Sequence, residues 1–421
     1  MTFFYDLLYF IAVVLYFPFF VARGKRHPGF SMRFGEFPAA LRSTLWKREN
    51  IWIHAVSVGE VLAAKKLVEF LEKTFPALQI VISTVTPTGY AVAHKTFSSA
   101  SIVFAPLDFS WVVRRYINLI KPRAYIAMET EIWPNLFGAL KRNKVPILLV
   151  NGRISDKSFG RYRAAKLFLK PALNCVDIFL MQSERDAQRI KELGAHPQKV
   201  SVAGNMKFDD FAAIREIHAR DLGFDANDQF LVAGSTHPGE EEILLAVYEA
   251  LQKEFSALKL ILAPRHIERT DEVLELVKQK GFSPVKFSGL KTGKKSEGAV
   301  VVLDVMGELK SLYSLAALVF VGKSLKGGGG QNIIEPACFA KPIFIGPHNQ
   351  NFQDIVDIFK GEGAVVIIKD GEELLAGMRQ LLKNPGEASR LGQSARSVSE
   401  KYKGASQKAA QVAAKLIAES V

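Results

Sequence analysis

Hydrophobic and polar positions follow one another in regular blocks along most of the chain. Apolar runs of four to six residues, for example at 51–56, 80–83 and 124–127, have the length and composition of strands that are buried on both faces. Each run ends in a polar turn, and a longer amphipathic stretch follows it. Repeated strand–helix units of this kind predict an open parallel sheet with right-handed crossovers, so we expect an α/β protein.

The block pattern occurs twice, which predicts two doubly wound domains. In the first half the expected strands lie at residues 51–56, 80–83, 102–105, 124–127, 146–150, 178–181 and 200–203. In the second half they lie at 230–234, 258–263, 300–303, 316–322, 342–346 and 365–368. The pattern is interrupted near Gly204. We therefore expect an N-terminal domain over residues 26–204, a C-terminal domain over 205–385 and a helical segment over 386–421.

The chain begins with a different pattern. Residues 3–22 form a nearly continuous apolar run that only Asp6 and Pro18 interrupt. The run is just long enough to span a bilayer, and the basic residues that follow it would keep the next segment on the cytoplasmic side. We expect residues 1–25 to anchor the protein to a membrane, either across the bilayer or in its interface. A helix of the protein core is the alternative.

Between this run and the first strand, residues 31–37 place Arg33 and Glu36 among aromatic side chains. A functional role near the membrane surface and a structural turn fit this segment equally well.

The 421-residue chain carries 55 Lys and Arg against 42 Asp and Glu, a net charge of +13. This excess fits an anionic partner: nucleic acid, an acidic membrane surface or a phosphorylated substrate. The basic residues are spread along the chain and do not form one basic helix, which argues against nucleic acid. Two cysteines allow one disulfide at most, which favours a reducing compartment. No C-x-x-C or H-E-x-x-H motif occurs, and no D-x-D motif, which removes one common way of holding a metal–nucleotide pair.

Four consecutive glycines at 327–330 follow the expected strand at 316–322 and precede a short helix. Their uncovered backbone N–H groups allow close approach to an anion, and the helix presents its positive end to it. Asn332 and Glu335 are three apart and share one helix face, where a carboxylate suits the hydroxyls of a ribose. A flexible surface loop is the alternative, because glycine runs alone are weak signals. No G-x-x-x-x-G-K-[ST] motif is present, so the loop is not a P-loop.

Other polar residues of the second half also follow strand ends. Ligands of doubly wound sheets bind at the carboxyl ends of strands, so we expect these residues to converge on one site. Lys207, Arg265, Ser235 and Thr236 offer cations and hydroxyls to a phosphate. The segment 306–308 opens another helix, where main-chain groups can contact a base. Taken alone, each of these residues is more often a surface or capping residue.

Carboxylates stand at the strand ends of the first half. Glu129 and Glu131 follow the strand at 124–127, and Glu60 lies in the turn after the first strand. A carboxylate at such an edge is a candidate general base. Ser57 and Glu60 also have the S-x-x-E spacing of a capping box, so the residues alone leave Glu60 divided between base and cap.

Nine short sequences, distributed over nearly the whole chain, resemble the Kdo transferases, which are GT-B glycosyltransferases (glycosyltransferase family 30). The nine are HAVSVGE at 54–60, TVTPTG at 84–89, METEIWPN at 128–135, NGRIS at 151–155, GNMKFD at 204–209, STHPGE at 235–240, APRH at 263–266, MGEL at 306–309 and NIIE at 332–335. The resemblance implies two Rossmann-like domains that face a central cleft, with an N-terminal membrane-anchor helix.

The family transfers 3-deoxy-D-manno-oct-2-ulosonic acid (Kdo) from CMP-Kdo to a lipid A precursor, lipid IVA, in lipopolysaccharide core biosynthesis. The resemblance therefore implies an inverting transferase at the cytoplasmic face of the inner membrane of a Gram-negative bacterium, held at its anionic surface. It implies CMP-Kdo as donor substrate, no metal or other cofactor, and no nucleic-acid partner. A UDP-sugar transferase of the same fold, acting on another membrane lipid, is the alternative.

The resemblance also implies roles for single residues. Glu60 matches the catalytic base of the family, and we expect Glu129, Glu131, Arg33 and Glu36 near the acceptor and the donor sugar. The residues expected to contact the nucleotide are Lys207, Ser235, Thr236, Pro264, Arg265, Met306, Gly307, Glu308, Gly329, Gly330, Asn332, Ile333, Ile334 and Glu335. The long glycine run and Gln331 depart from many members, which have a shorter run and His at this position.

Overall fold

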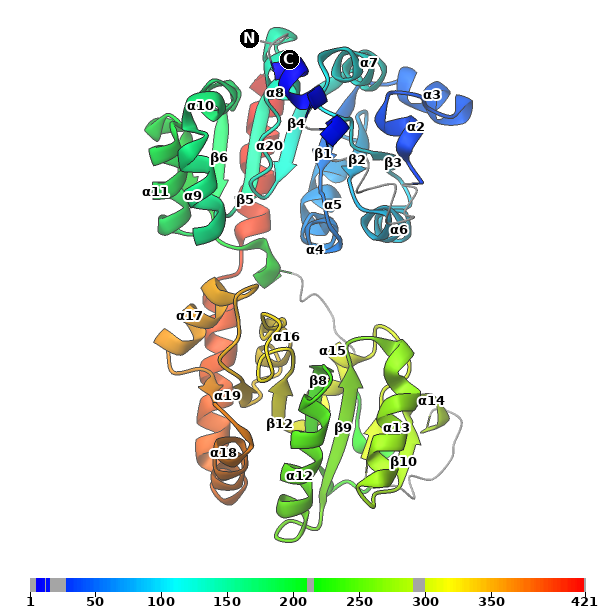
Figure 1. The fold of residues 1–421 in the computed structure, drawn as a ribbon, viewed down its shortest axis with the longest axis vertical. Coiled ribbons are helices and arrows are strands. Elements are labelled where there is room, and N and C mark those ends of the chain that lie inside the picture. The colour runs from blue at the N-terminus through cyan, green and yellow to red at the C-terminus, as the bar shows by residue number, and fades with distance from the viewer. Residues whose placement is uncertain (1–4, 12, 16–27, 210–215, 291–299, 420–421) are drawn as a thin grey trace. The chain divides into compact units, whose positions relative to one another are not determined.

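The computed structural model describes residues 5–11, 13–15, 28–209, 216–290 and 300–419. The chain forms two compact units, which Figure 1 shows as a ribbon. Unit 1 comprises Met1–Asp210 and Tyr402–Val421, and unit 2 comprises Phe211–Lys401. Each unit is built on one parallel sheet, as the block pattern predicts.

Within the described residues, the sheet of unit 1 has seven parallel strands in the order β3-β2-β1-β4-β5-β6-β7. The strands are β1 Asn50–His54, β2 Gln79–Thr84, β3 Ser101–Phe104, β4 Pro122–Met128, β5 Ile147–Gly152, β6 Ile178–Met181 and β7 Val200–Val202. The helices are α2 Phe30–Arg33, α3 Ala39–Trp46, α4 Val58–Ala63, α5 Lys65–Thr74, α6 Pro87–Thr96, α7 Ser110–Ile120, α8 Pro134–Arg142, α9 Asp156–Ala164, α10 Lys166–Cys175, α11 Glu184–Leu193, η1 Pro197–Lys199, η2 Met206–Asp209 and α20 Ala405–Glu419.

Helices cover both faces of this sheet, and the strands show why. Successive residues of a strand point to opposite faces. Trp52 of β1 therefore packs in one apolar core with residues of α7 and α8, while Ile51 and Ile53 pack in a second core with residues of α5 and α20. Strands that are buried on both faces must be apolar throughout, which is the pattern that the sequence displays.

The sheet of unit 2, counted over the residues that the structure describes, also has seven parallel strands, in the order β10-β11-β9-β8-β12-β13-β14. The strands are β8 Gln229–Thr236, β9 Leu258–Pro264, β10 Pro284–Lys286, β11 Val300–Val302, β12 Ala316–Val321, β13 Ile343–Ile345 and β14 Val366–Ile367. The helices are η3 Ala219–Leu222, α12 Glu240–Gln252, η4 Ile267–Arg269, α13 Thr270–Gln279, α14 Phe287–Leu290, α15 Leu309–Leu312, η5 Tyr313–Leu315, α16 Ile334–Ala337, α17 Gln353–Gly361, α18 Gly371–Lys383 and α19 Pro385–Lys401.

Both sheets are doubly wound, and each has one point where the winding direction reverses. In unit 1 this switch point lies between β1 and β4, and in unit 2 it lies between β8 and β12. The loops at the carboxyl ends of these strand pairs are the usual ligand-binding position of such sheets.

Every strand expected from the sequence is present, and one further strand is not among the expectations. β10 is a three-residue edge strand, Pro284–Lys286, with one apolar side chain of strand type. It is too short and too polar to give a periodic signal, and proline is tolerated at its start because the strand pairs on one side only.

The chain divides between the units at a different place from the one expected. The expected N-terminal domain ends at residue 204, whereas unit 1 continues to Asp210. The expected helical segment at 386–421 is shared: α19 belongs to unit 2 and α20 to unit 1. The carboxylate of Asp209 accepts hydrogen bonds from the backbone N–H groups of Gly404 (2.6 Å) and Ser406 (2.5 Å), and this fixes the start of α20 in unit 1.

The helical residues 5–11 and 13–15 belong to unit 1. Asp6 accepts hydrogen bonds at Oδ1 from the backbone N–H of Ser110 (3.0 Å) and at Oδ2 from its hydroxyl (2.6 Å), so it caps the N-terminus of α7. Most of the expected membrane anchor, at 1–4, 12 and 16–25, lies outside the described residues. In the part of the chain that the structure describes, no helix is long and apolar enough to cross a membrane.

Candidate functional site

The first group of expected site residues lies at the switch point of unit 1. Glu60 is in the first turn of α4, directly after β1, and Glu129 and Glu131 follow β4. β1 and β4 are paired in parallel, so their carboxyl ends lie at the same edge of the sheet. The charges of Glu129 and Glu131 both act on Glu60. The structure therefore brings the three carboxylates together.

Glu60 is held in the turn by two hydrogen bonds. The side chain is buried, with the residue 7% exposed. Oε2 accepts from the backbone N–H of Val56 (2.8 Å), and Oε1 accepts from the hydroxyl of Ser57 (2.9 Å). In a capping box, the hydroxyl of Ser57 would instead accept from a backbone N–H of the helix, and it does not. Ser57 and Glu60 therefore do not form the reciprocal pair of hydrogen bonds that defines a capping box.

Burial and nearby negative charge make Glu60 and Glu131 weak acids. Burial, together with the charge of Glu129, raises the pKa of Glu60 to about 7. Burial and the charge of Glu129 likewise raise the pKa of Glu131 to about 7. A carboxylate with such a pKa accepts a proton readily near neutral pH, which is the requirement for a general base.

Glu129 has an unusual backbone conformation. Its φ is +56°, in the left-handed region, and its backbone N–H donates to Val150 O at 2.8 Å. This conformation costs a residue other than glycine roughly 1–2 kcal/mol. Strain of this kind is retained mostly at functional positions, where the surrounding structure enforces it. The turn after β4 is such a position.

Buried aromatic and histidine side chains lie next to the carboxylates. Nδ1 of His54 lies 2.9 Å from the hydroxyl of Ser83, which also accepts from Nε1 of Trp52 at 2.8 Å. Burial lowers the pKa of His54 to about 4, so the imidazole is neutral. Among the described residues, Nε2 of His54 and the polar atoms of Tyr125 and Trp133 are buried without a partner. These three groups are free to hydrogen-bond a ligand or water.

Sequence reasoning missed Tyr125 and Trp133. Tyr125 lies in an apolar strand and Trp133 before a helix, and both look like core residues from the sequence. Their rings pack around His54, at centroid distances of 6.4 Å and 6.1 Å. For Trp133 the motif at 128–135 was an available signal, whereas the middle of an apolar strand gives none for Tyr125.

Arg33 and Glu36 have different surroundings. Nε of Arg33 donates to Ala105 O at 3.2 Å, and burial lowers the pKa of this guanidinium. The charge of Arg33 also acts on His54, so Arg33 lies near the carboxylate edge. Glu36 is exposed, and its backbone N–H donates to Ser31 O at 3.1 Å in a turn. Of the two residues, the structure brings only Arg33 to the site.

In unit 2 a buried glutamate fixes the loops at the switch point. Glu240, in the first turn of α12, accepts four backbone hydrogen bonds: from His237 (3.0 Å), Lys323 (2.7 Å), Ser324 (3.0 Å) and Leu325 (3.0 Å). The first lies after β8 and the other three after β12. One carboxylate therefore joins the two loops, a role that the motif at 235–240 did not reveal.

The glycine loop at 327–330 has a defined conformation. All four glycines have positive φ, between +77° and +108°. The loop is fixed by hydrogen bonds from Gly330 N to Lys323 O (2.7 Å) and from Asn351 N to Gly329 O (2.8 Å). Atoms of Asn349 and Asn351 fill the space beside Gly330 and Gly329, while the space beside Gly327 is open. The loop is thus a hydrogen-bonded turn whose backbone a ligand can approach at Gly327.

Asn332 and Glu335 share a face at the start of α16, as the spacing predicts. Nδ2 of Asn332 donates to Oε1 of Glu335 at 3.3 Å, and Nζ of Lys310 lies 3.8 Å from the same oxygen. The side chains of Ile333 and Ile334 are fully buried, and Ile334 N donates to Oδ1 of Asn332. The structure therefore leaves no surface of these two isoleucines open to a nucleotide.

Four further expected residues lie at the ends of β8 and β9. Ser235 has a φ of +56°, and Thr236 is fully buried with a hydroxyl that has no partner among the described residues. The backbone N–H of Arg265, directly after Pro264, donates to Thr236 O at 3.0 Å. The side chain of Arg265 is exposed. The structure therefore places a cation and an unpaired hydroxyl on neighbouring strand ends.

The segment 306–308 is the most open part of this edge. Met306 is 87% exposed, Gly307 has a φ of +88° with open space around it, and Glu308 is the N-cap of α15. Exposure of a large apolar side chain such as that of Met306 to water is unusual. It fits a surface that a flat ligand covers.

Lys207 does not lie with the other expected nucleotide-binding residues. It belongs to η2 in unit 1, and η2 packs against α4, the helix that carries Glu60. Its assignment to the second domain is therefore corrected. The interruption at Gly204 looked like a boundary, but Asp209 ties the following turn back to unit 1 through α20.

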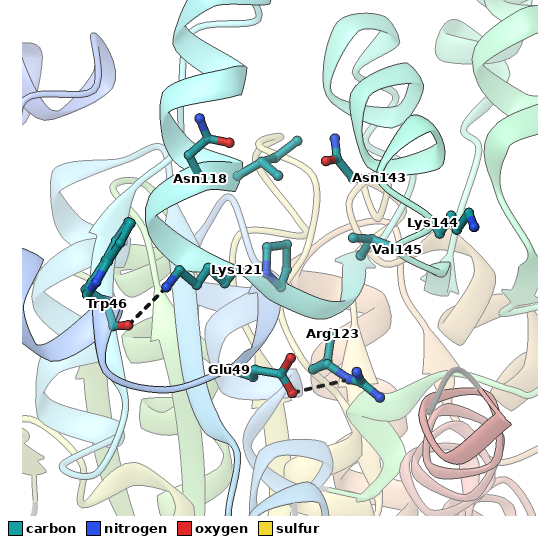
Figure 2. Close-up of a pocket in the computed structure, with 10 residues that line it drawn as sticks. Trp46, Glu49, Asn118, Lys121, Arg123, Asn143, Lys144 and Val145 are labelled. Atoms are coloured by element: carbon teal, nitrogen blue, oxygen red, sulfur yellow. Dashed lines mark hydrogen bonds and ion pairs between the residues drawn. The ribbon is translucent and has the colours of Figure 1, made fainter.

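Among the described residues, no group of three His, Cys, Asp or Glu side chains is placed to hold a metal ion. A large pocket of about 600 Å³ lies at the opposite, amino ends of β1 and β4 (Figure 2). Two of its three cations are engaged: Nζ of Lys121 lies 3.6 Å from the ring centroid of Trp46, and Arg123 pairs with Glu49 at 3.6 Å. The C-termini of α7 and α8 border it, so their dipoles also disfavour an anion there.

Two doubly wound domains, one with buried carboxylates and the other with cations and backbone donors at the switch point, define the GT-B class of glycosyltransferases. Comparison with known proteins agrees. Residues 29–210 match the family model described as 3-deoxy-D-manno-octulosonic-acid transferase (Kdo transferase), and residues 235–398 match glycosyl transferases group 1. A 3-deoxy-D-manno-octulosonic acid transferase of Haemophilus influenzae is 33% identical over 86% of this chain and 85% of its own length.

The chain belongs to the Kdo transferase family and is a glycosyltransferase. A bifunctional glycosyltransferase/methyltransferase of Fusobacterium nucleatum is 36% identical over 83% of this chain, which spans 54% of that longer protein. Among solved structures, a UDP-GlcNAc 2-epimerase from Neisseria meningitidis bound to UDP-GlcNAc has a TM-score of 0.59 at 10% identity, covering 87% of this chain and 100% of its own. That likeness concerns the fold alone.

Proposed function

We propose that this enzyme transfers Kdo from CMP-Kdo to a lipid A precursor, with inversion at the anomeric carbon and with Glu60 as general base. The observation that carries the proposal is the state of Glu60. It is a buried carboxylate at the switch point of unit 1, its pKa is raised to about 7, and it accepts only two hydrogen bonds. About half of such a group is ionised at neutral pH and ready to take a proton.

In the proposed reaction, Glu60 takes the proton of a sugar hydroxyl of the acceptor. The hydroxyl oxygen forms a bond to the anomeric carbon of Kdo on the face opposite the phosphate. The bond from that carbon to the phosphate oxygen breaks, and CMP leaves with both electrons of the bond. Attack from the opposite face inverts the configuration. The hydrogen bonds from Val56 and Ser57 aim the carboxylate and leave its remaining lone pairs for the hydroxyl.

We assign the nucleotide to the switch point of unit 2. The exposed guanidinium of Arg265 and the open backbone at Gly327 suit the phosphate, and the Asn332–Glu335 pair suits the ribose. The hydroxyl of Thr236 is buried and unpaired among the described residues, which is a costly state unless a ligand or water completes it. Lys207 stays a predicted phosphate contact.

Glu129, Glu131 and Arg33 are proposed to surround the sugars. A negatively charged edge beside the base repels a second anion, so Arg33 offers the nearby positive charge that an acidic sugar requires. Glu36 is exposed in a turn, and we assign it no contact with substrate. The proposal needs no metal, because cations and backbone donors of the chain balance the phosphate charge.

We further propose that the enzyme works at the cytoplasmic face of the inner membrane, in lipopolysaccharide biosynthesis. Support comes from the N-terminal helical residues. Their outward positions are all apolar and exposed: Leu7, Leu8, Phe10, Ile11, Val14 and Leu15. A helix that shows such a face is not stable in water and is typical of one that lies in a membrane interface.

A donor screen tests the proposal. The purified full chain is incubated with a lipid A precursor and either CMP-Kdo or a panel of UDP-sugars, with and without EDTA. Transfer from CMP-Kdo alone, unaffected by EDTA, is the expected result. Transfer from a UDP-sugar would replace the proposal by the alternative of a UDP-sugar transferase, and loss of transfer in EDTA would overturn the metal-free mechanism.

A further inference from the structure

Unit 1 contains an apolar groove of about 420 Å³ that the proposed reaction does not use. It lies between the N-terminal helical residues, α8 and α10. Its walls include Tyr5 and Leu8 from the N-terminal residues, Gly138 and Arg142 from α8, and Phe168 and Cys175 from α10. Most of this lining is apolar, and the guanidinium of Arg142 is its charged member.

The N-terminal wall of the groove is fixed to the domain by polar contacts. Besides capping α7, Oδ1 of Asp6 accepts a hydrogen bond from Nδ2 of Asn135 at 2.7 Å. The ring of Tyr9 packs edge-on against Phe109 at a centroid distance of 4.9 Å. This explains the single carboxylate in the apolar run. Residues 5–9 are therefore a built part of unit 1, and the groove beside them has two fixed walls.

Large apolar side chains at the rim of the groove are exposed to water. Leu8 is 44% exposed, and Leu167 and Phe168 at the start of α10 are 85% and 62% exposed. Contiguous apolar surface of this kind, beside a concave site, marks a position that a ligand or a membrane covers. Its shape, an elongated apolar groove, fits an alkyl chain.

Positive charge lies within the groove, at the guanidinium of Arg142 on α8. Among the residues that the structure describes, no carboxylate forms an ion pair with Arg142. An alkyl groove with a cation in its wall fits a lipid whose head group carries phosphate.

The groove begins a short distance along the chain from the carboxylates of unit 1. Pro134 and Asn135 belong to its lining, and they follow Glu131 by three and four residues. Three residues of extended chain span at most about 11 Å. A lipid whose sugar lies at the carboxylates therefore has this groove within reach of its own acyl chains, whereas a bulk phospholipid has no reason to be held there.

We propose that the groove between the N-terminal helical residues, α8 and α10 binds an acyl chain of the lipid acceptor. The N-terminal residues are then a wall of the acceptor site as well as a membrane contact. The proposal rests on the proposed function in one respect, which is that the acceptor is an acylated, phosphorylated sugar.

Cys175 gives a direct test, because it lines the groove and the other cysteine, Cys338, lies in unit 2. Burial raises the pKa of the Cys175 thiol, so alkylation is followed by mass spectrometry at mildly alkaline pH. The full chain in detergent is alkylated with lipid IVA, with the same disaccharide stripped of its acyl chains, or with a phospholipid. We expect lipid IVA alone to slow alkylation of Cys175 severalfold, with Cys338 unchanged.

Two results would overturn the proposal: equal rates at Cys175 with and without lipid IVA, or equal protection by the phospholipid. The second would mean that the groove takes any membrane lipid. Alkylation requires no transfer, so the outcome is independent of the donor screen. A wrong donor assignment leaves this test intact, and a failed protection leaves the transferase assignment intact.

Filling the groove gives an independent measurement. A side chain at Gly138 meets only the tip of Arg142 Nη1 at 3.5 Å, so Gly138→Phe fits the helix and occupies the groove. We expect the KM for lipid IVA to rise about tenfold, since excluding two methylene groups suffices for that. The kcat and the affinity for CMP should not change. Gly160→Phe, at an exposed glycine of α9 with nothing within 4 Å, is the matched control. An unchanged KM in Gly138→Phe would contradict an acyl site here.

Discussion

Glu60 and Glu240 occupy corresponding places in the two units and have opposite surroundings. Each lies in the first turn of the helix that follows the first strand of its sheet, and each comes directly after a glycine. Both are buried. Glu60 accepts two hydrogen bonds, one from a backbone N–H and one from a hydroxyl. Glu240 accepts four, all from backbone N–H groups.

A carboxylate has about four lone-pair positions, so Glu240 is saturated and Glu60 is not. Four donors stabilise the charge of Glu240 and leave no position for a substrate. Two donors leave Glu60 with lone pairs that a hydroxyl can use, and burial beside Glu129 makes its charge costly. The same position of one fold thus serves architecture in one unit and, as we propose, catalysis in the other, and the number of donors decides which.

Glu60→Gln should have the largest effect. The amide keeps the size of the side chain but cannot accept a proton, so we expect kcat to fall by roughly 10²–10⁴-fold, the usual contribution of positioned proton transfer. Steady-state kinetics with lipid IVA measures the loss. Binding of CMP should stay near wild type, because the proposed nucleotide site lies in unit 2. Near-normal turnover would move the search for the base to Glu129 and Glu131.

Glu240→Gln should show the reverse pattern. The amide NH₂ group replaces one carboxylate oxygen and cannot accept hydrogen bonds. Two backbone N–H groups therefore lose their acceptor, and each buried, unsatisfied donor costs about 1–3 kcal/mol. We expect unit 2 to lose roughly 2–5 kcal/mol of stability by thermal or denaturant unfolding. CMP affinity should fall only because less of the unit is folded. A stable Glu240→Gln protein with a normal melting temperature would refute the architectural role.

Arg265→Ala should weaken the nucleotide site without affecting stability. The side chain is exposed and its loss removes a charge-assisted hydrogen bond to phosphate, worth about 1.5–3 kcal/mol, or roughly 10- to 150-fold in affinity. Calorimetric titration with CMP measures it. Arg220→Ala, which removes a cation from η3 of the same unit, is the control for net charge. An unchanged affinity in Arg265→Ala would remove this residue from the site.

The sequence predicted what local patterns determine. The apolar runs located the strands, and the residues at their ends included Glu60, Glu131, Arg265 and the Asn332–Glu335 pair, because parallel topology gathers strand ends at one edge. Short motifs therefore placed most of the candidate site.

What the sequence did not predict depends on contacts between distant residues. Three of the donors to Glu240 lie 83 to 85 residues away, so no local pattern reports its role. Lys207 was placed in the wrong unit because Asp209 caps α20 across 195 residues. The unpaired groups of Tyr125 and Trp133 are visible only once the packing of their neighbours is known.

The contrast between the two glutamates also predicts how stability depends on pH. The pKa of Glu60 rises from an ordinary value of 4.5 in the unfolded chain to about 7 in the folded one. The folded state therefore binds the proton more tightly, and the stability that this provides is complete below pH 4.5 and is lost as the pH rises through 7. The loss is at most about 1.4 kcal/mol per pH unit for one group.

Glu60→Gln cannot ionise, so its stability relative to wild type should grow as the pH rises from 4.5 to 7 and then stay constant. Melting temperatures of both proteins over this range measure the difference. Glu131→Gln should behave in the same direction, since burial raises the pKa of that group to about 7 as well. The activity of the wild type should rise over the same pH range, because the ionised base is the active form. Parallel stability curves for wild type and Glu60→Gln would mean that Glu60 ionises normally, and the proposed base would lose its physical support.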